Sequence, residues 1–121
     1  KFFRKRAEEE NLHHQWIMDY LTNADYQFTY PQTDVNTVKI ESLITPFIAT
    51  VDREIETTNL IYKIYEMALA EKDYMTLVWL QSKLLPEQIE EENLARVSRS
   101  IMEMDANLLV KSENILELLE K

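Results

Sequence analysis

The order of hydrophobic and polar residues along the chain predicts an all-helical protein. Apolar side chains recur every three or four residues in four segments, which is the spacing of one face of an α-helix. Between the first two of these segments, the stretch 26–41 is rich in β-branched and aromatic residues and lacks the helical period. We therefore expect a non-helical crossover over 26–41 and helices over about 1–24, 42–70, 73–104 and 106–120.

The lengths of the connections predict how these helices are arranged. The break around Lys72 and Asp73 is short, and short connections join antiparallel neighbours in helical bundles. At about 3.3 Å per residue, the stretch 26–41 can extend over roughly 50 Å and run the length of a long helix. The pattern thus predicts a single domain over 1–121: a four-helix bundle with one long crossover and a short C-terminal fifth helix. Its remaining long helix would come from residues outside this chain.

Charged residues interrupt the predicted apolar faces at mid-length. Glu10 and His13 lie in the face of the first helix, Glu54 in that of the second, and Glu87 and Glu91 in that of the third. A run of glutamates taken alone is more often a solvated helix face. However, an unpaired carboxylate in a core costs several kcal/mol, which is comparable with a domain's net stability of about 5–15 kcal/mol. Because three helices share this feature, the sequence predicts a bound cation between them.

Two of these apolar faces can be written out at the alternating spacing of three and four residues. The predicted face of the second helix comprises Ile44, Phe47, Val51, Glu54, Thr58, Ile61, Tyr65 and Ala68. The predicted face of the third helix comprises Leu77, Leu80, Leu84, Glu87, Glu91, Leu94, Ser98 and Ile101.

Composition excludes several kinds of chemistry. The 121 residues contain no glycine and no cysteine. Phosphate-binding loops, the dinucleotide-binding fingerprint and nucleophile elbows need glycine, and thiolate metal sites and disulfides need cysteine. The formal net charge of −9 argues against nucleic acid as a partner. The chain also lacks a stretch of about 18 apolar residues that could span a membrane, so we expect a cytoplasmic protein.

The types of candidate ligand indicate which metal would bind. Carboxylates with an imidazole and without thiolates suit iron or manganese. Glu10 and His13 are three residues apart, so both side chains can face one ion from the same side of a helix. A Glu-x-x-His unit in a helical bundle is typical of ferritin-like di-iron carboxylate proteins.

These motifs together resemble bacterial non-haem ferritin. The resemblance covers the chain from Phe2 to about Met104, and the family's first helix and the start of its second are absent from these residues. The similar segments are Arg4–Glu10 followed by His13 and Asp19–Leu21, Glu54 with Asp73–Tyr74 nineteen residues later, and Glu87–Glu92.

The resemblance implies a di-iron centre with an additional iron site. Glu10 would bridge two irons, His13 would complete the first, and Glu54 would bind the second. Gln88 would lie close by and support a dioxygen pocket, and Glu91 would be shared with the second iron. The third iron site would be formed by Glu9, Glu87, Glu90 and Glu91.

The function implied by the resemblance is iron storage with ferroxidase activity. Fe(II) would be oxidised by dioxygen or peroxide, and Fe(III) mineral would be deposited inside a hollow homo-oligomeric shell of 24 subunits, the size found in the family. No haem is expected, because Asn11 stands where haem-binding relatives have methionine. The alternative is a catalytically silent or truncated ferritin-like subunit that serves structure or slow mineral nucleation.

The segment around Pro86 departs from the family pattern. The distance from Leu80 to Glu87 is one residue longer than in the family. An inserted residue in a helix is usually absorbed as a π-bulge or a kink, and proline inside a regular helix costs about 3 kcal/mol. We expect such a distortion beside Pro86, and it leaves the register of 87–91 open.

Overall fold

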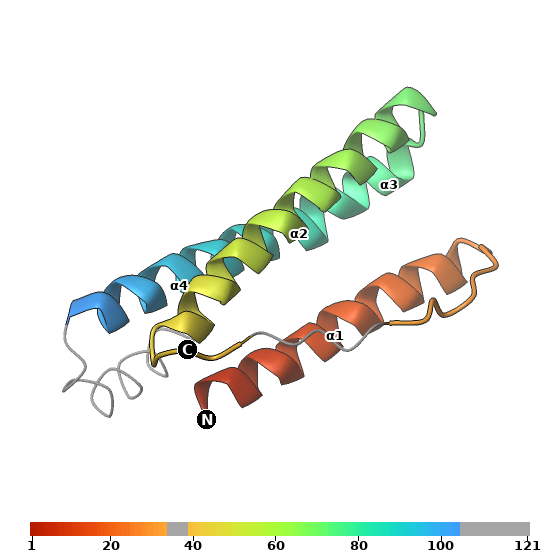
Figure 1. Ribbon diagram of the computed structural model, residues 1–121. Coiled ribbons are helices and arrows are strands. Elements are labelled where there is room, and N and C mark those ends of the chain that lie inside the picture. Colours follow the sequence, from red (N-terminus) through yellow and green to blue (C-terminus); the bar gives the residue numbers. More distant parts are fainter. Residues whose placement is uncertain (34–38, 105–121) are drawn as a thin grey trace. The chain divides into compact units, whose positions relative to one another are not determined.

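The computed structural model describes residues 1–33 and 39–104 (Figure 1). The chain divides into two compact units, Lys1–Thr37 and Val38–Lys121, and each is described by itself. Every regular element in the described ranges is a helix, which confirms the predicted all-α class. The helix predicted over 106–120 lies outside the described residues. Within the described residues, no helix is both long enough and apolar enough to cross a membrane.

The first unit consists of one long helix and the segment that follows it. Helix α1 spans Phe2–Asn23, within one residue of its predicted bounds at each end. Its C-terminus is closed by two bonds, from Tyr26 N–H to the Leu21 carbonyl (2.9 Å) and from Asp25 N–H to the Thr22 carbonyl (3.1 Å). This pair of bonds is a Schellman motif. Asp25 takes the left-handed conformation with φ 61°.

In the second unit, helix α2 spans Thr45–Ala70. The sequence predicted a start near Ser42, but the helix begins at Thr45, and the Ser42 hydroxyl lies 3.0 Å from that of Thr45. Pro46 occupies the first turn, where its missing N–H leaves no helical bond unmade. All eight residues of the predicted apolar face are buried or half-buried, so the face of α2 was predicted correctly.

A three-residue turn separates α2 from the next helix, α3, which spans Tyr74–Trp79. Lys72 adopts the left-handed conformation with φ 57°, and Asp73 N–H bonds to the Ala68 carbonyl at 2.8 Å in a second Schellman motif. The Asp73 carboxylate then accepts a bond from Thr76 N–H at 3.2 Å and caps α3. The turn reverses the direction of the chain between α2 and α3.

The chain then passes through a π-helix, η1, before it continues as α4 over Leu85–Met104. η1 spans Leu80–Leu84, and Leu85 N–H bonds to the carbonyl of Leu80, five residues back instead of four. Pro86 has no N–H, and in a regular α-helix its ring would clash with the carbonyl of Ser82. The wider turn removes this clash, and it confirms the distortion predicted beside Pro86.

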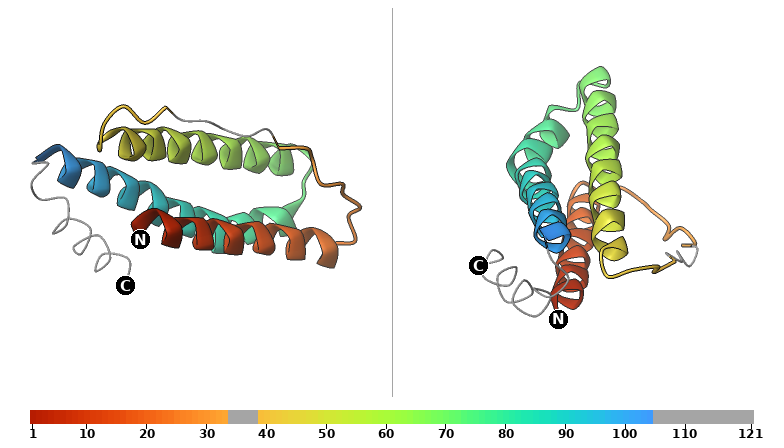
Figure 2. Two further views of the ribbon diagram at one scale, coloured as in Figure 1. Left: turned by 60° about the horizontal axis from the view of Figure 1, so that its bottom comes forward. Right: turned by 60° about the vertical axis from the view of Figure 1, so that its left-hand side comes forward.

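Helices α2 and α4 lie side by side as the two arms of an antiparallel hairpin (Figures 1 and 2). Hydrogen bonds join Tyr65 to Gln81 and Glu54 to Gln88, each at 2.8 Å. The residue with the lower number in α2 bonds to the residue with the higher number in the second arm, which is the pairing of antiparallel helices. The predicted hairpin is therefore confirmed within this unit.

The buried side chains of the second arm differ in part from the predicted face. The buried residues of the second arm are Leu77, Leu80, Leu84, Gln88, Glu91, Ala95 and Ser98. Five of the eight predicted residues are buried and the other three, Glu87, Leu94 and Ile101, are half-buried, but the prediction missed the buried Gln88 and Ala95. These two lie one position after Glu87 and Leu94, so both rows keep a spacing of three or four residues.

The left-handed residue in the hairpin turn leads to a stability prediction. A non-glycine residue in this conformation costs about 1–2 kcal/mol, and glycine avoids that cost but loses more chain entropy on folding. Lys72→Gly should therefore raise the free energy of unfolding by about 0.5–1 kcal/mol. Lys63→Gly, at an exposed position inside α2, should lower it by about 1 kcal/mol. Chemical denaturation measures both, and a Lys72→Gly variant no more stable than the wild type would contradict the strain.

Candidate metal centre

The hairpin of the second unit brings carboxylates from two helices together. Glu54 on α2 is half-buried and Glu91 on α4 is buried. One carboxylate oxygen of Glu54 and one of Glu91 lie within 4.8 Å of each other. Small divalent cations bind oxygens at about 2.0–2.2 Å, so two oxygens on one ion lie up to about 4 Å apart. The two oxygens are therefore near the spacing of two ligands on one cation.

A third carboxylate lies on the same helix as Glu91. Glu87 is one turn earlier in α4, and one of its oxygens also lies within 4.8 Å of one of Glu91. Like charges four residues apart destabilise a helix, and a bound cation would remove the repulsion. Glu90, the other residue of α4 predicted for the third iron site, has an exposed side chain.

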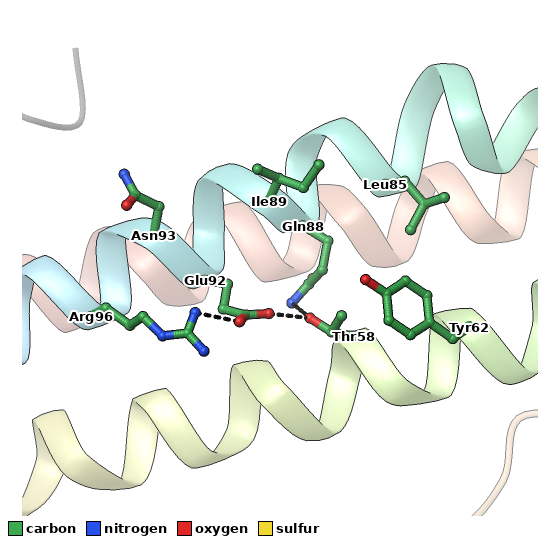
Figure 3. Close-up of a pocket in the computed structure, with 8 residues that line it drawn as sticks. All are labelled: Thr58, Tyr62, Leu85, Gln88, Ile89, Glu92, Asn93 and Arg96. Atoms are coloured by element: carbon green, nitrogen blue, oxygen red, sulfur yellow. Dashed lines mark hydrogen bonds and ion pairs between the residues drawn. The ribbon is translucent and has the colours of Figure 1, made fainter.

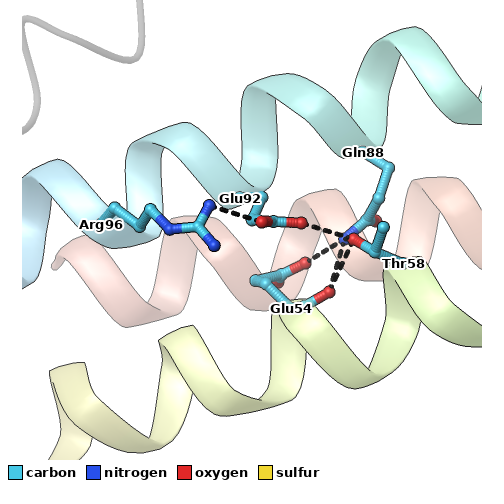
Figure 4. Close-up of polar contacts among 5 residues, drawn as sticks. All are labelled: Glu54, Thr58, Gln88, Glu92 and Arg96. Carbon is cyan, nitrogen blue, oxygen red and sulfur yellow. Dashed lines mark hydrogen bonds and ion pairs between the residues drawn. The ribbon is translucent and has the colours of Figure 1, made fainter.

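Gln88 bonds directly to the candidate ligand Glu54 (Figure 4). Its side-chain nitrogen lies 2.8 Å from Glu54 Oε2, 3.0 Å from the Glu54 backbone carbonyl and 3.2 Å from the Thr58 hydroxyl. The amide therefore donates toward α2 and holds the Glu54 side chain against the hairpin interface. Gln88 itself is buried.

Thr58 extends these contacts to an ion pair on α4. Its hydroxyl lies 2.7 Å from Glu92 Oε2, and the Arg96 guanidinium bonds to the other carboxylate oxygen of Glu92 (Figure 4). The hydrogen bond from Thr58 is the main reason why the pKa of Glu92 lies below its ordinary value. Arg96 lowers this pKa further, whereas partial burial acts in the opposite direction.

A pocket of about 420 Å³ opens between α2 and α4 beside these contacts (Figure 3). Thr58 and Gln88 lie in its middle, with Tyr62 and Leu85 toward one end and Arg96 toward the other. The pocket is lined by Thr58, Tyr62, Leu85, Gln88, Ile89, Glu92, Asn93 and Arg96. A small molecule in the pocket would therefore lie beside the amide that bonds to Glu54.

In the first unit, α1 places the predicted Glu-x-x-His unit on one side of the helix. Glu10 Oε2 lies 3.8 Å from His13 Nδ1, and the Glu10 side chain is exposed. Glu9 forms an ion pair with Arg6 at 2.7 Å on the same helix. The spacing therefore brings a carboxylate and an imidazole together, as the sequence predicted.

The structure thus groups the predicted site residues within each unit. Glu10 and His13 are neighbours in the first unit, and Glu54, Gln88, Glu87 and Glu91 are neighbours in the second. That both groups form one di-iron centre stays a prediction. Sequence reasoning assigned no role to Thr58, Glu92 or Arg96. A signal was present, because Thr58 is a polar residue on the apolar face one turn after Glu54.

Comparison with known proteins identifies the family. Residues 1–99 match the Ferritin family, described as a ferritin-like domain. This chain belongs to the ferritin-like domain family. The match covers more than half of the chain, and it confirms the family resemblance found in the sequence.

Curated relatives of this ferritin-like chain are bacterial non-heme ferritins. The protein from Staphylococcus aureus strain USA300 is 30% identical over 93 residues, which are 77% of this chain and 55% of that protein. The protein from Staphylococcus epidermidis is 29% identical over 92 residues, 76% of this chain and 55% of that protein. The chain thus spans about half the length of the curated relatives that it matches.

A solved structure shows the same fold. A humanized archaeal ferritin matches with a TM-score of 0.86 at 23% sequence identity, over 98% of this chain and 72% of that one. At this identity the likeness shows the fold alone, which is ferritin-like.

The lowered pKa of Glu92 leads to a prediction for stability against pH. Because the folded pKa lies below the ordinary value of 4.5, ionised Glu92 stabilises the fold above that value. This contribution is lost as the pH falls through the folded pKa. The difference in urea midpoint between the wild type and Glu92→Gln should therefore be constant above about pH 5.5 and shrink below about pH 4.5.

The same comparison, made in a protein that also carries Thr58→Val, tests the cause of this pH dependence. The Thr58 hydroxyl is the main contributor to the lowered pKa, so the pH-dependent part of the difference should become smaller in Thr58→Val. A difference in urea midpoint that is the same at about pH 3.5 and at about pH 7 would contradict the stabilising role of the carboxylate.

Proposed function

We propose that this chain is part of an iron-storage protein with ferroxidase activity. Its centre would comprise Glu10, His13, Glu54 and Glu91, with Gln88 beside Glu54. Glu9, Glu87 and Glu90 would contribute, with Glu91, to the third iron site. The observation that carries the proposal is the approach of the Glu54 and Glu91 carboxylates to within 4.8 Å at the hairpin interface of a ferritin-like chain.

The donor set suits the oxidation of ferrous iron. Carboxylate oxygens are hard ligands, and they stabilise Fe(III) relative to Fe(II). Two Fe(II) ions each lose one electron, and one dioxygen takes up both electrons and two protons to give hydrogen peroxide. With peroxide as the oxidant, two electrons and two protons give two waters. The protein contributes chiefly by holding the metal ions in position.

The charge of the chain fits this role. The formal net charge of −9 attracts cations, and acidic surfaces raise their local concentration near a site. Ferric product would then leave the centre and be deposited as mineral inside a homo-oligomeric shell. The shell of 24 subunits, the oxidant, the lack of haem and the cytoplasmic location are expectations that belong to this proposal.

Substitution of the α2 ligand tests the proposed activity. Glu54→Ala should slow the fast phase of Fe(II) oxidation by about 100-fold or more, because it removes a carboxylate that holds the metal. The measurement is stopped-flow absorbance of Fe(III) formation after Fe(II) is mixed with air-saturated full-length protein. Glu56→Ala, an exposed glutamate two residues later on α2, is the matched control and should oxidise iron at the wild-type rate.

Equal rates in the wild type and Glu54→Ala would reject the ferroxidase assignment. A wild type that lacks the fast phase and mineralises iron slowly would instead support a catalytically silent ferritin-like subunit. Circular dichroism of each variant shows whether the helices are retained.

A further inference from the structure

A continuous line of polar contacts crosses the hairpin from Glu54 on α2 to Arg96 on α4 (Figure 4). It runs from Glu54 through Gln88 to Thr58, and from Thr58 through Glu92 to Arg96. Every member lies in the second unit, on α2 or α4. The line begins at a proposed iron ligand and ends at an ion pair.

The surroundings of Gln88 allow only one orientation of its amide. The nitrogen faces three acceptors, which are the carboxylate and backbone carbonyl of Glu54 and the hydroxyl of Thr58. A rotation of the amide by about 180° would place its oxygen against these acceptors and replace attraction by repulsion. The donation of Gln88 to Glu54 is therefore set by the groups around it.

Thr58 determines the direction in which hydrogen bonds are donated along this line of contacts. A hydroxyl has one hydrogen to donate and two lone pairs to accept. Thr58 Oγ1 lies 2.7 Å from the Glu92 carboxylate and 2.9 Å from the Glu54 backbone carbonyl, and bonds to charged acceptors are the stronger ones. Thr58 therefore donates to Glu92 and turns its lone pairs toward the Gln88 amide.

The ion pair fixes the far end of the line. Arg96 bonds to Glu92 one turn away on the same helix, so the carboxylate that receives the Thr58 hydroxyl is held in place. The Glu92 side chain is largely covered, with 19% of its surface exposed, whereas 54% of that of Arg96 is exposed. The partly exposed Arg96 thus holds Glu92 in position, and Glu92 in turn bonds to Thr58 at the interface between the helices.

We propose that Thr58, Glu92 and Arg96 are positioning residues that orient the Gln88 amide and, through it, the Glu54 carboxylate for iron oxidation. The inference rests on the proposed ferroxidase function. Groups that orient metal ligands typically change metal affinity or activity by about 10–100-fold when they are removed.

A pair of substitutions at Thr58 separates the hydroxyl from the volume of the side chain. Thr58→Val keeps the shape and removes the hydroxyl, whereas Thr58→Ser keeps the hydroxyl. In the full-length protein, Thr58→Val should lower the rate of the fast oxidation phase about tenfold, and Thr58→Ser should stay within about twofold of the wild type. Equal losses in the two variants would overturn the inference.

A double-mutant cycle with Gln88→Leu tests whether Thr58 acts through Gln88. If it does, Thr58→Val should change the rate by less than about twofold once the Gln88 amide is gone. A full tenfold loss in that background would overturn the proposed route. Stoichiometry of Co(II) binding by isothermal titration calorimetry should stay unchanged in Thr58→Val, because the metal ligands themselves are retained.

Arg96, on α4 at the far end of the line of contacts, provides a further test. Arg96→Gln should lower the oxidation rate about threefold, and Arg96→Lys should oxidise iron at close to the wild-type rate. If Arg96 were only a structural contact, its loss would lower the thermal midpoint without this difference in oxidation rate between the two variants. Equal rates in the wild type and Arg96→Gln would remove Arg96 from the inference and so contradict it.

The results also distinguish this inference from the proposed function. A wild type with rapid iron oxidation that depends on Glu54 but not on the Thr58 hydroxyl would reject the positioning role alone. A wild type without rapid oxidation, and with no effect of Glu54→Ala, would reject the ferroxidase function and the positioning role together.

Discussion

The need to accommodate carboxylates between two packed helices governs the structure of the second unit. Glu54 and Glu91 approach within 4.8 Å at an interface whose neighbouring positions are apolar, including Val51 and Leu84. Charges in such a place are destabilising unless hydrogen bonds or a cation compensate them. The Gln88 amide supplies part of this compensation through its bond to Glu54. The same property that makes the interface costly for the fold makes it suitable for binding metal.

Helix geometry decides which side chains reach this interface. A π-helix before Pro86 adds one residue to a turn. After it, Gln88 lies in the buried row that includes Leu84 and Glu91. Proline and the wider turn support each other, since the ring cannot fit a regular α-helix and the missing N–H suits a break in the bond pattern. The position of Gln88 in the buried row places its amide beside Glu54.

The contacts around Glu54 connect the proposed chemistry with the stability of the hairpin. Thr58, Gln88 and Glu92 link α2 to α4, so they contribute to the packing of the two helices as well as to the orientation of Glu54. A ferritin-like subunit that oxidises iron needs ligands held in fixed positions while ions enter and leave. Bonds among neutral and charged partners in a mostly covered interface provide that rigidity.

The sequence by itself was sufficient for the features that depend on local patterns. The face of α2, the Asp73 cap and the distortion beside Pro86 follow from spacing and residue type within one or two turns. The burial of Gln88 did not, because a row through Glu87 and a row through Gln88 both fit the spacing of three and four residues, and packing against α2 selects between them. The bonds from Glu54 and Thr58 to Gln88 and Glu92 join residues 30 to 34 positions apart. Only the packed hairpin brings those side chains together, since hydrogen bonds act over about 3 Å and their partners are chosen by the meeting of two helices.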